Sequence, residues 1–262
     1  MTAQRDPAPP ALPAGERLAK RVAALLPCSR REAEQYIEGG WVRVDGRVVQ
    51  EPMFRISNQT LEIDREASLL ELTAVTLLLH KPSGYEAMAT HDEPNARIKA
   101  AQQLLQPDSH TADDASGVRV LGRHFAKLSA CLPLESAASG LVVFTQDWRV
   151  LRKLREEANT IEQEMIVEVA GQVSDEALRK LKQTQAADSP TRPSLKISIN
   201  SASPSTTRLR FAIKGTQPDL IAHLCQRAAL SILSVKRLRI GRVAMNSLPL
   251  GQWRYLQAHE RF

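Results

Sequence analysis

Residues 16–64 constrain the fold more tightly than any other part of this 262-residue chain. Helical spacing of apolar residues over 16–26 ends at a proline, and a serine N-cap with a glutamate three residues later begins a second helix over 30–38. The Asp45-Gly46 pair is typical of a two-residue hairpin, and residues 61–63 alternate as one more strand. This order of signals predicts a small domain of two helices and a few strands.

Residues 75–262 predict a second, larger domain after a link over 65–74. Its strands and helices mix without strict strand–helix–strand alternation, which indicates an α+β fold with a mainly antiparallel sheet. A turn over 80–84 and an acidic surface loop over 107–117 interrupt it. The predicted strands are 75–79, 141–144, 165–169, 195–199, 209–213 and 232–238, and the predicted helices are 147–157, 175–182 and 220–229.

Composition excludes several classes of protein. No stretch approaches 18 uninterrupted apolar residues, which argues against a membrane span. Residues 1–15 hold four prolines and no apolar segment, so we expect a disordered tail rather than a secretory signal. Three widely spaced cysteines and six histidines without ligand spacing predict neither disulfides nor a metal, and Asp113-Asp114 is interpreted as part of a solvated loop. We therefore expect a cytoplasmic protein.

The charge is unevenly distributed along the chain. The formal net charge is +6, yet residues 205–262 alone hold ten lysines and arginines against two acidic residues, a local balance of +8. An excess of this kind is compatible with a nucleic-acid partner, although a solvated basic face is the alternative.

The first domain resembles the RNA-binding module named after small-subunit ribosomal protein S-four. The resemblance rests on residues 18–21 and 28–37, on Gly39 and on the strand, Asp-Gly, strand pattern that follows. It implies RNA binding, in which basic side chains on two adjacent helices meet the phosphate backbone. The expected RNA-binding residues are Arg17, Lys20, Arg21, Arg30 and Arg31.

The whole of 16–262 resembles the bacterial RsuA/RluF-type pseudouridine synthases, which join that module to a catalytic α+β domain. The segments that carry the resemblance are 79–84, 139–147, 237–241 and 248–256. It implies an RNA partner, for which ribosomal RNA or its precursor is the first expectation and tRNA the alternative. It also implies that the protein needs no cofactor or metal and is a monomer. The resemblance also predicts that Lys81 lies beside the substrate. Together with the excess of basic residues over 205–262, it predicts that Arg237 and Arg239 bind RNA.

The resemblance identifies Glu135 as the catalytic carboxylate, five residues before Gly140. The family carries aspartate there and arginine at the position of Pro133. Met165, expected to line the substrate site, stands where the family has a tyrosine, and Ile221 and Ala222 stand where it has paired arginines. Glutamate keeps the charge but moves the carboxylate by about 1.5 Å, a shift that can reduce a rate about a hundredfold.

Two hypotheses follow from these substitutions. The chain is an RNA pseudouridine synthase in which Glu135 replaces the aspartate, or it is a non-catalytic RNA-binding protein, such as a ribosome-assembly factor, on the same scaffold.

Overall fold

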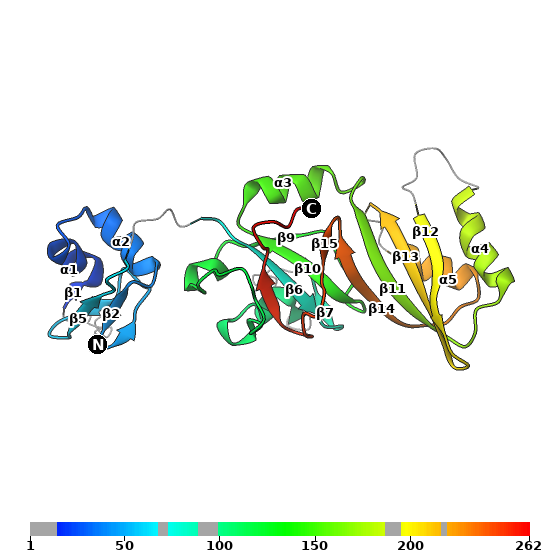
Figure 1. Ribbon diagram of the computed structural model, residues 1–262, viewed down its shortest axis with the longest axis horizontal. Coiled ribbons are helices and arrows are strands. Elements are labelled where there is room, and N and C mark those ends of the chain that lie inside the picture. The colour runs from blue at the N-terminus through cyan, green and yellow to red at the C-terminus, as the bar shows by residue number, and fades with distance from the viewer. Residues whose placement is uncertain (1–14, 68–72, 89–98, 187–194, 216–218) are drawn as a thin grey trace, which may run out of the picture. The chain divides into compact units, whose positions relative to one another are not determined.

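The computed structural model describes residues 15–67, 73–88, 99–186, 195–215 and 219–262. The chain divides into two compact units (Figure 1). Unit 1 comprises the residues up to Thr73 together with Leu121–Arg123, and unit 2 comprises Ala74–Val120 and His124–Phe262. Most of the predicted tail, and residues 68–72 of the predicted link, lie outside the described residues.

Unit 1 follows the sequence signals closely. Ser29 accepts a hydrogen bond from the Glu32 amide and the Glu32 side chain accepts one from the Ser29 amide, so the capping box begins the second helix as predicted. Positive φ angles of 48° and 76° at Asp45 and Gly46 turn the hairpin. Its elements are β1 (Glu16–Arg17), α1 (Leu18–Leu25), α2 (Arg30–Glu38), β2 (Val42–Val44), β3 (Arg47–Val48), β4 (Arg55–Ile56) and β5 (Leu61–Ile63).

Unit 2 is built on one nine-stranded sheet, which is antiparallel except for one pair. Its main path runs β12-β13-β11-β14-β10-β6-β16, with β9 paired to β10 and β15 paired to β14. The α+β prediction is therefore confirmed. The strands of unit 2 are β6 (Thr76–Lys81), β7 (Tyr85–Glu86), β8 (Lys99–Ala100), β9 (Ser129–Cys131), β10 (Ser139–Thr145), β11 (Glu162–Ala170), β12 (Leu195–Ala202), β13 (Thr206–Lys214), β14 (Ile232–Ile240), β15 (Val243–Ala244) and β16 (Trp253–Tyr255).

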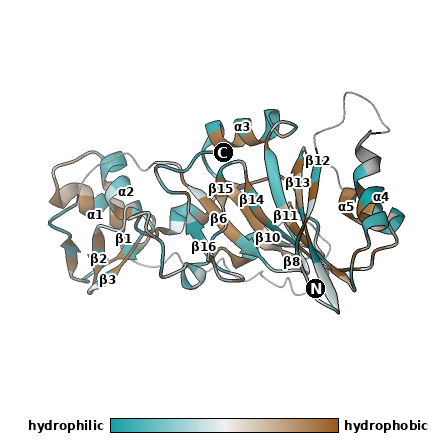
Figure 2. Cartoon of the chain, turned by 45° about the vertical axis from the view of Figure 1, so that its right-hand side comes forward, coloured by the Kyte–Doolittle hydropathy of each residue, from teal (hydrophilic) through white to brown (hydrophobic). Residues whose placement is uncertain are grey.

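Both faces of strand β10 are buried, because successive side chains of a strand point to opposite faces. Val142 and Phe144 join a core with Trp253, whereas Leu141 and Val143 join another core on the opposite face. Brown in Figure 2 marks hydrophobic residues along β6 and β10, and nearly all residues of these two strands are buried. Continuous apolar runs in the sequence are therefore explained by strands at the centre of the sheet.

Three helices flank the sheet, and none of the helices in the described residues is long and apolar enough to cross a membrane. α3 packs through Leu154 on the core that contains Leu141 and Val143. α4 and α5 pack on β11, β12 and β13 through a third core that includes Phe211 and Leu224. The three helices are α3 (Trp148–Glu156), α4 (Asp175–Ala186) and α5 (Leu220–Arg227).

Two sequence expectations are wrong in detail. The predicted turn over 80–84 begins later, because β6 continues through Lys81. The predicted solvated loop over 107–117 packs against β16: His110 bridges to Trp253, and the buried Asp114 carboxylate accepts hydrogen bonds from the Tyr255 amide and the His110 ring. These partners lie over 130 residues away or inside the loop, so local polarity did not reveal them.

Part of the excess positive charge of residues 205–262 is neutralised by ion pairs with glutamates on a neighbouring strand of the sheet. Arg208 and Arg210 pair with Glu168 and Glu164 of β11, and Arg239 pairs with Glu162 and Glu164. A count along the sequence misses these pairs because strands distant in the chain lie side by side in the sheet. Three of the ten lysines and arginines in this segment therefore lie in ion pairs on the sheet.

Gly140 allows β10 and β14 to approach each other closely, because it has no side chain. A Cβ at this position would lie 2.3 Å from the Arg237 carbonyl oxygen and 2.4 Å from its nitrogen, and the φ of Gly140 is +118°. We expect Gly140→Ala to lower the free energy of unfolding by at least about 3 kcal/mol in urea titrations.

Gly171→Ala is the matched control for this prediction. Gly171 also has a positive φ, +72°, but nothing lies within 4 Å of a Cβ added there. The free energy of unfolding should therefore fall by only about 1 kcal/mol. Equal losses in the two variants would contradict the role assigned to the close approach.

Candidate functional site

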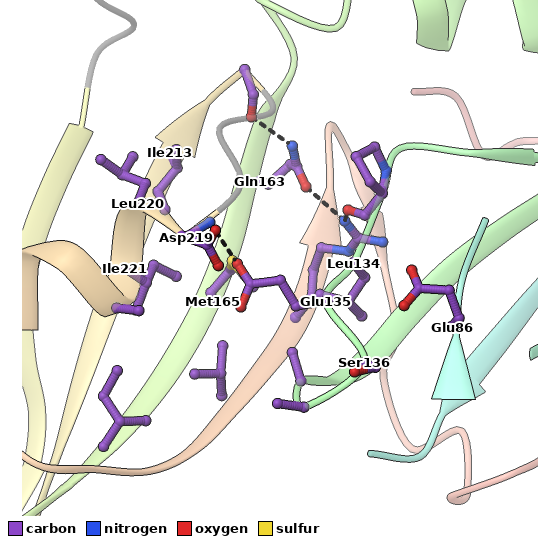
Figure 3. Close-up of a pocket in the computed structure, with 18 residues that line it drawn as sticks. Glu86, Leu134, Glu135, Ser136, Gln163, Met165, Ile213, Asp219, Leu220 and Ile221 are labelled. Atoms are coloured by element: carbon purple, nitrogen blue, oxygen red, sulfur yellow. Dashed lines mark hydrogen bonds between the residues drawn. The ribbon is translucent and has the colours of Figure 1, made fainter. Parts of the chain in front are cut away.

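A pocket of about 620 Å³ opens in unit 2 beside the loop that carries Glu135 (Figure 3). Its walls come from the loop between β9 and β10, from β11, β13 and β14, and from the beginning of α5. The lining residues are predominantly apolar. Glu86, Glu135, Asp219 and Arg237 are the ionisable groups among the residues that line it.

The Glu135 carboxylate reaches across the pocket toward α5 (Figure 3). Its Oε1 accepts a hydrogen bond of 3.0 Å from the backbone amide of Asp219. Asp219 is the N-cap residue of α5 and has a positive φ of 59°. The hydrogen bond therefore holds the Glu135 carboxylate at the N-terminal end of α5.

Arg237 holds the chain on both sides of Glu135. The guanidinium is 1 % exposed and donates to the carbonyl oxygens of Leu132, Pro133 and Leu141, at 3.2, 2.9 and 2.7 Å. Leu132 has a positive φ of 60°, a conformation that costs energy in a residue other than glycine and that these bonds help to maintain. Burial lowers the pKa of Arg237. Arg237 lines the pocket but is almost fully buried, and it donates hydrogen bonds to the loop, to β10 and to Gln163. Its contact with RNA stays a prediction.

Lys81 holds the second half of the same loop. Its ammonium lies 2.6 Å from the carbonyl oxygen of Ala138, 3.3 Å from that of Ser136 and 2.8 Å from that of Tyr85. The side chain is fully buried and does not line the pocket, so the structure makes it a positioning residue rather than the substrate contact that we expected. Burial lowers the pKa of Lys81 to about 8.

Gln163 connects the two walls of the pocket, a role that sequence reasoning missed. Its Oε1 accepts from Arg237 and its Nε2 donates to the Gly215 carbonyl, each at 2.9 Å (Figure 3). Gly215 ends the described part of the β13 wall, and α5 begins after residues 216–218, which lie outside the described residues. Nothing in the local sequence marks this glutamine, because its partners come from two other strands.

The apolar wall is formed at the positions where the resemblance led us to expect polar residues. Met165, Ile221 and Ala222 all line the pocket. Methionine has no proton to donate, and the two aliphatic side chains cannot neutralise a phosphate. The pocket therefore places the Glu135 carboxylate opposite an apolar wall, with Glu86 and Asp219 also among its lining residues.

His80 and Cys131 are buried and are not among the residues that line the pocket. His80 Nδ1 lies 2.8 Å from the Leu248 carbonyl oxygen, and burial lowers the pKa of this imidazole. Burial raises the pKa of the Cys131 thiol to about 11. Among the described residues, no group of three or more histidine, cysteine or acidic side chains is arranged to hold a metal ion.

Unit 1 carries a basic groove of about 590 Å³. Arg17, Lys20 and Arg30 line it, as the two-helix arrangement predicts, and Arg55 joins them because β4 pairs with β1. Arg21 does not line the groove and instead pairs with Glu16 at 2.8 Å.

Two further residues expected to bind RNA lie elsewhere. Arg31 is exposed but does not line the groove of unit 1. Arg239 lies in unit 2 and is paired with two glutamates. The groove therefore contains three of the five basic residues that the resemblance predicted to bind RNA. It also contains Arg55, which the sequence did not predict because the two-residue strands β1 and β4 are too short to recognise from a pattern.

Comparisons with known proteins agree with both units. The S4 domain family matches residues 16–59. An uncharacterized RNA pseudouridine synthase of Aquifex aeolicus is 24% identical over 248 residues, covering 93% of this chain and 94% of that protein. The dual-specificity RNA pseudouridine synthase RluF of Escherichia coli is 25% identical over 253 residues, covering 93% of this chain and 76% of that protein.

A solved structure shares the fold. A crystal structure of pseudouridylate synthase aligns with a TM-score of 0.53 at 19% identity, covering 92% of this chain and 96% of that one. The chain thus carries an S4 domain, shares the fold of a pseudouridylate synthase, and is similar over 93% of its length to RNA pseudouridine synthases such as RluF.

The buried Lys81 predicts a specific pH dependence of stability. Between about pH 8 and its ordinary pKa of 10.5, the folded chain has released the Lys81 proton while the unfolded chain still holds it. The free energy of unfolding should therefore rise with pH in this window. We expect a gain of about 2 kcal/mol between about pH 7.5 and 9.5 relative to Lys81→Met, measured by urea titration. If the free energy of unfolding changed with pH in the same way in the wild type and in Lys81→Met, this prediction would be contradicted.

Proposed function

We propose that the chain binds structured RNA, ribosomal RNA in particular, through the groove of unit 1, and acts in the cytoplasm as a monomer. The S4 match over residues 16–59 and the convergence of Arg17, Lys20, Arg30 and Arg55 support this proposal. Phosphate contacts from such side chains supply most of the sequence-independent affinity for RNA. We also propose the domain limits 16–64 and 75–262, joined by the link 65–74.

The pocket of unit 2 receives an unpaired base in this proposal and does not isomerise it. The observation that carries this is the apolar wall at Met165, Ile221 and Ala222, which can pack on a base but supplies neither a proton donor nor a cation. Four hydrogen bonds from Arg237 go to Leu132 and Pro133 of the loop, to Leu141 of β10 and to Gln163, so in this proposal the guanidinium serves the protein rather than a ligand.

Isomerisation by Glu135 is the second candidate. Its carboxylate lies in the pocket at the position of the family aspartate, on a loop that two buried cations hold in place. A carboxylate at the sugar of a flipped uridine is the group that this chemistry requires. Its displacement by one bond and the lack of tyrosine and arginine argue against an efficient reaction.

A tritium-release assay separates the two candidates. Ribosomal RNA labelled with tritium at uridine carbon 5 loses the label when the base is rejoined through that carbon. We expect no release by the wild-type protein under conditions in which it binds the RNA. Release by wild type that Glu135→Ala abolishes, and that Glu86→Gln retains, would establish the isomerase instead; Glu86 also lines the pocket and controls for the loss of a carboxylate.

RNA binding by unit 1 has its own test. The triple variant Arg17→Gln/Lys20→Gln/Arg30→Gln should lower RNA affinity and reduce the slope of log affinity against log salt by about 2 to 3, since each phosphate contact contributes about 0.7 to 0.9. The control Arg47→Gln removes an exposed charge from β3, outside the groove, and should change the slope little. An unchanged slope in the triple variant would contradict the assignment of the groove.

A further inference from the structure

Helix α3 presents an exposed tryptophan beside basic side chains. Trp148 is the first residue of α3 and is 61% exposed. The guanidinium groups of Arg149 and Arg152 lie 5.8 and 5.5 Å from the centre of its ring. Exposing most of an indole is unfavourable unless another surface covers it, whereas Leu154 on the opposite side of the helix is buried as a core contact should be.

The outer face of α3 is also positively charged. It carries Arg149, Arg152, Lys153 and Arg155 against the N-cap residue Asp147 and against Glu156 and Glu157 at its end, a balance of +1. Arg152 pairs with Glu156 and Lys153 with Glu157, but all four side chains are at least 45% exposed, so these ion pairs are screened and contribute little. The face therefore keeps a net positive charge around the tryptophan.

We propose that α3 is a second RNA-binding surface, on which an unpaired base stacks on Trp148 while Arg149 and Arg152 contact the flanking phosphates; this rests on the proposed RNA-binding function. Every base has a π-face that stacks on an aromatic ring, and arginine adds both charge and stacking. Aromatic rings interleaved with arginines are how proteins commonly recognise single-stranded RNA.

The charge pattern favours RNA over a protein partner. Among the described residues of α3, Trp148 is the single large apolar side chain with an exposed fraction above one third. A protein interface needs a contiguous apolar centre, whereas here the exposed ring is surrounded by cations. Figure 2 shows α3 alternating between brown and teal, in agreement with one apolar face on the sheet and one polar face outward.

This surface is separate from the pocket. Leu154 of α3 packs with Leu141 and Val143 of β10, whereas Ala138 and Leu134 beside the pocket pack with Val142 and Phe144 on the opposite face. Because alternate residues of β10 point to opposite faces, α3 and the pocket lie on opposite sides of the sheet. The base on Trp148 is therefore a different nucleotide from any that enters the pocket.

Fluorescence anisotropy with two RNA probes tests the proposal. The probes are a fluorescein-labelled single strand of about twelve nucleotides and a duplex of the same sequence. Trp148→Ala should weaken binding of the single strand roughly tenfold and binding of the duplex less than twofold, because only unpaired bases stack. The control is Leu250→Ala, which removes a side chain of equal exposure, 61%, and should leave both affinities unchanged.

A charge variant gives an independent measurement. Arg149→Gln/Arg152→Gln should reduce the salt slope for the single strand by about 1.4, at about 0.7 per phosphate. Arg179→Gln/Lys180→Gln makes the same charge change on the exposed side of α4 and should leave the slope as in the wild type. Single-strand binding should also quench tryptophan emission in the wild type more than in Trp148→Phe; Trp253, by contrast, is fully buried.

The outcomes distinguish this inference from the proposed function. One outcome would contradict the role of α3 and leave the proposed function intact. In it, RNA binding depends on Arg17, Lys20 and Arg30, while Trp148→Ala binds both probes as Leu250→Ala does. Failure of the wild type to bind either probe would overturn RNA binding and this inference together. Equal losses for single strand and duplex in Trp148→Ala would also overturn stacking as the basis.

Discussion

Two buried cations hold the loop on which the candidate site depends. Lys81 and Arg237 lie in strands on either side of β10 and point their charged groups at backbone carbonyl oxygens rather than at carboxylates. Buried charges are unfavourable unless hydrogen bonds satisfy them, so each cation stabilises the fold only while the loop keeps its position. The path of residues 132–138 and the charge of two side chains are thus mutually dependent. Gly140 makes this possible, since β10 and β14 approach too closely there for a side chain.

The position of Glu135 follows from that constraint. Arg237 orders the residues before it, Lys81 orders those after it, and the Asp219 amide holds its carboxylate. Such preorganisation is what a catalytic carboxylate requires, yet the facing wall is apolar. The loop that carries the acid is held in place, whereas Met165, Ile221 and Ala222 on the facing wall supply neither a proton donor nor a cation. This combination is the reason for proposing that the pocket binds a base.

Local elements were predictable to the extent that their signals are local. The capping box at Ser29 and the hairpin at Asp45-Gly46 involve neighbours in the sequence, and both form as expected. The burial of Asp114 and the pairing of Arg239 depend on residues far along the chain, and there the expectations of a solvated loop and an RNA contact did not match the observed positions. Glu135 and Met165 were found from a family resemblance, and the structure brings both to one pocket.

The sequence by itself indicated the longer helices and strands of both parts, because periodicity, caps and turn residues act over a few positions. The family resemblance rested on its motifs instead. Only the tertiary structure decided which charges remain available. Arg17, Lys20 and Arg30 meet in a groove, whereas Arg237 and Lys81 are enclosed, although all five are basic residues that the sequence alone made equally plausible ligands. The physical reason is that burial and hydrogen-bond partners are set by contacts between distant strands, and these decide whether a cation serves a ligand or the protein's own backbone.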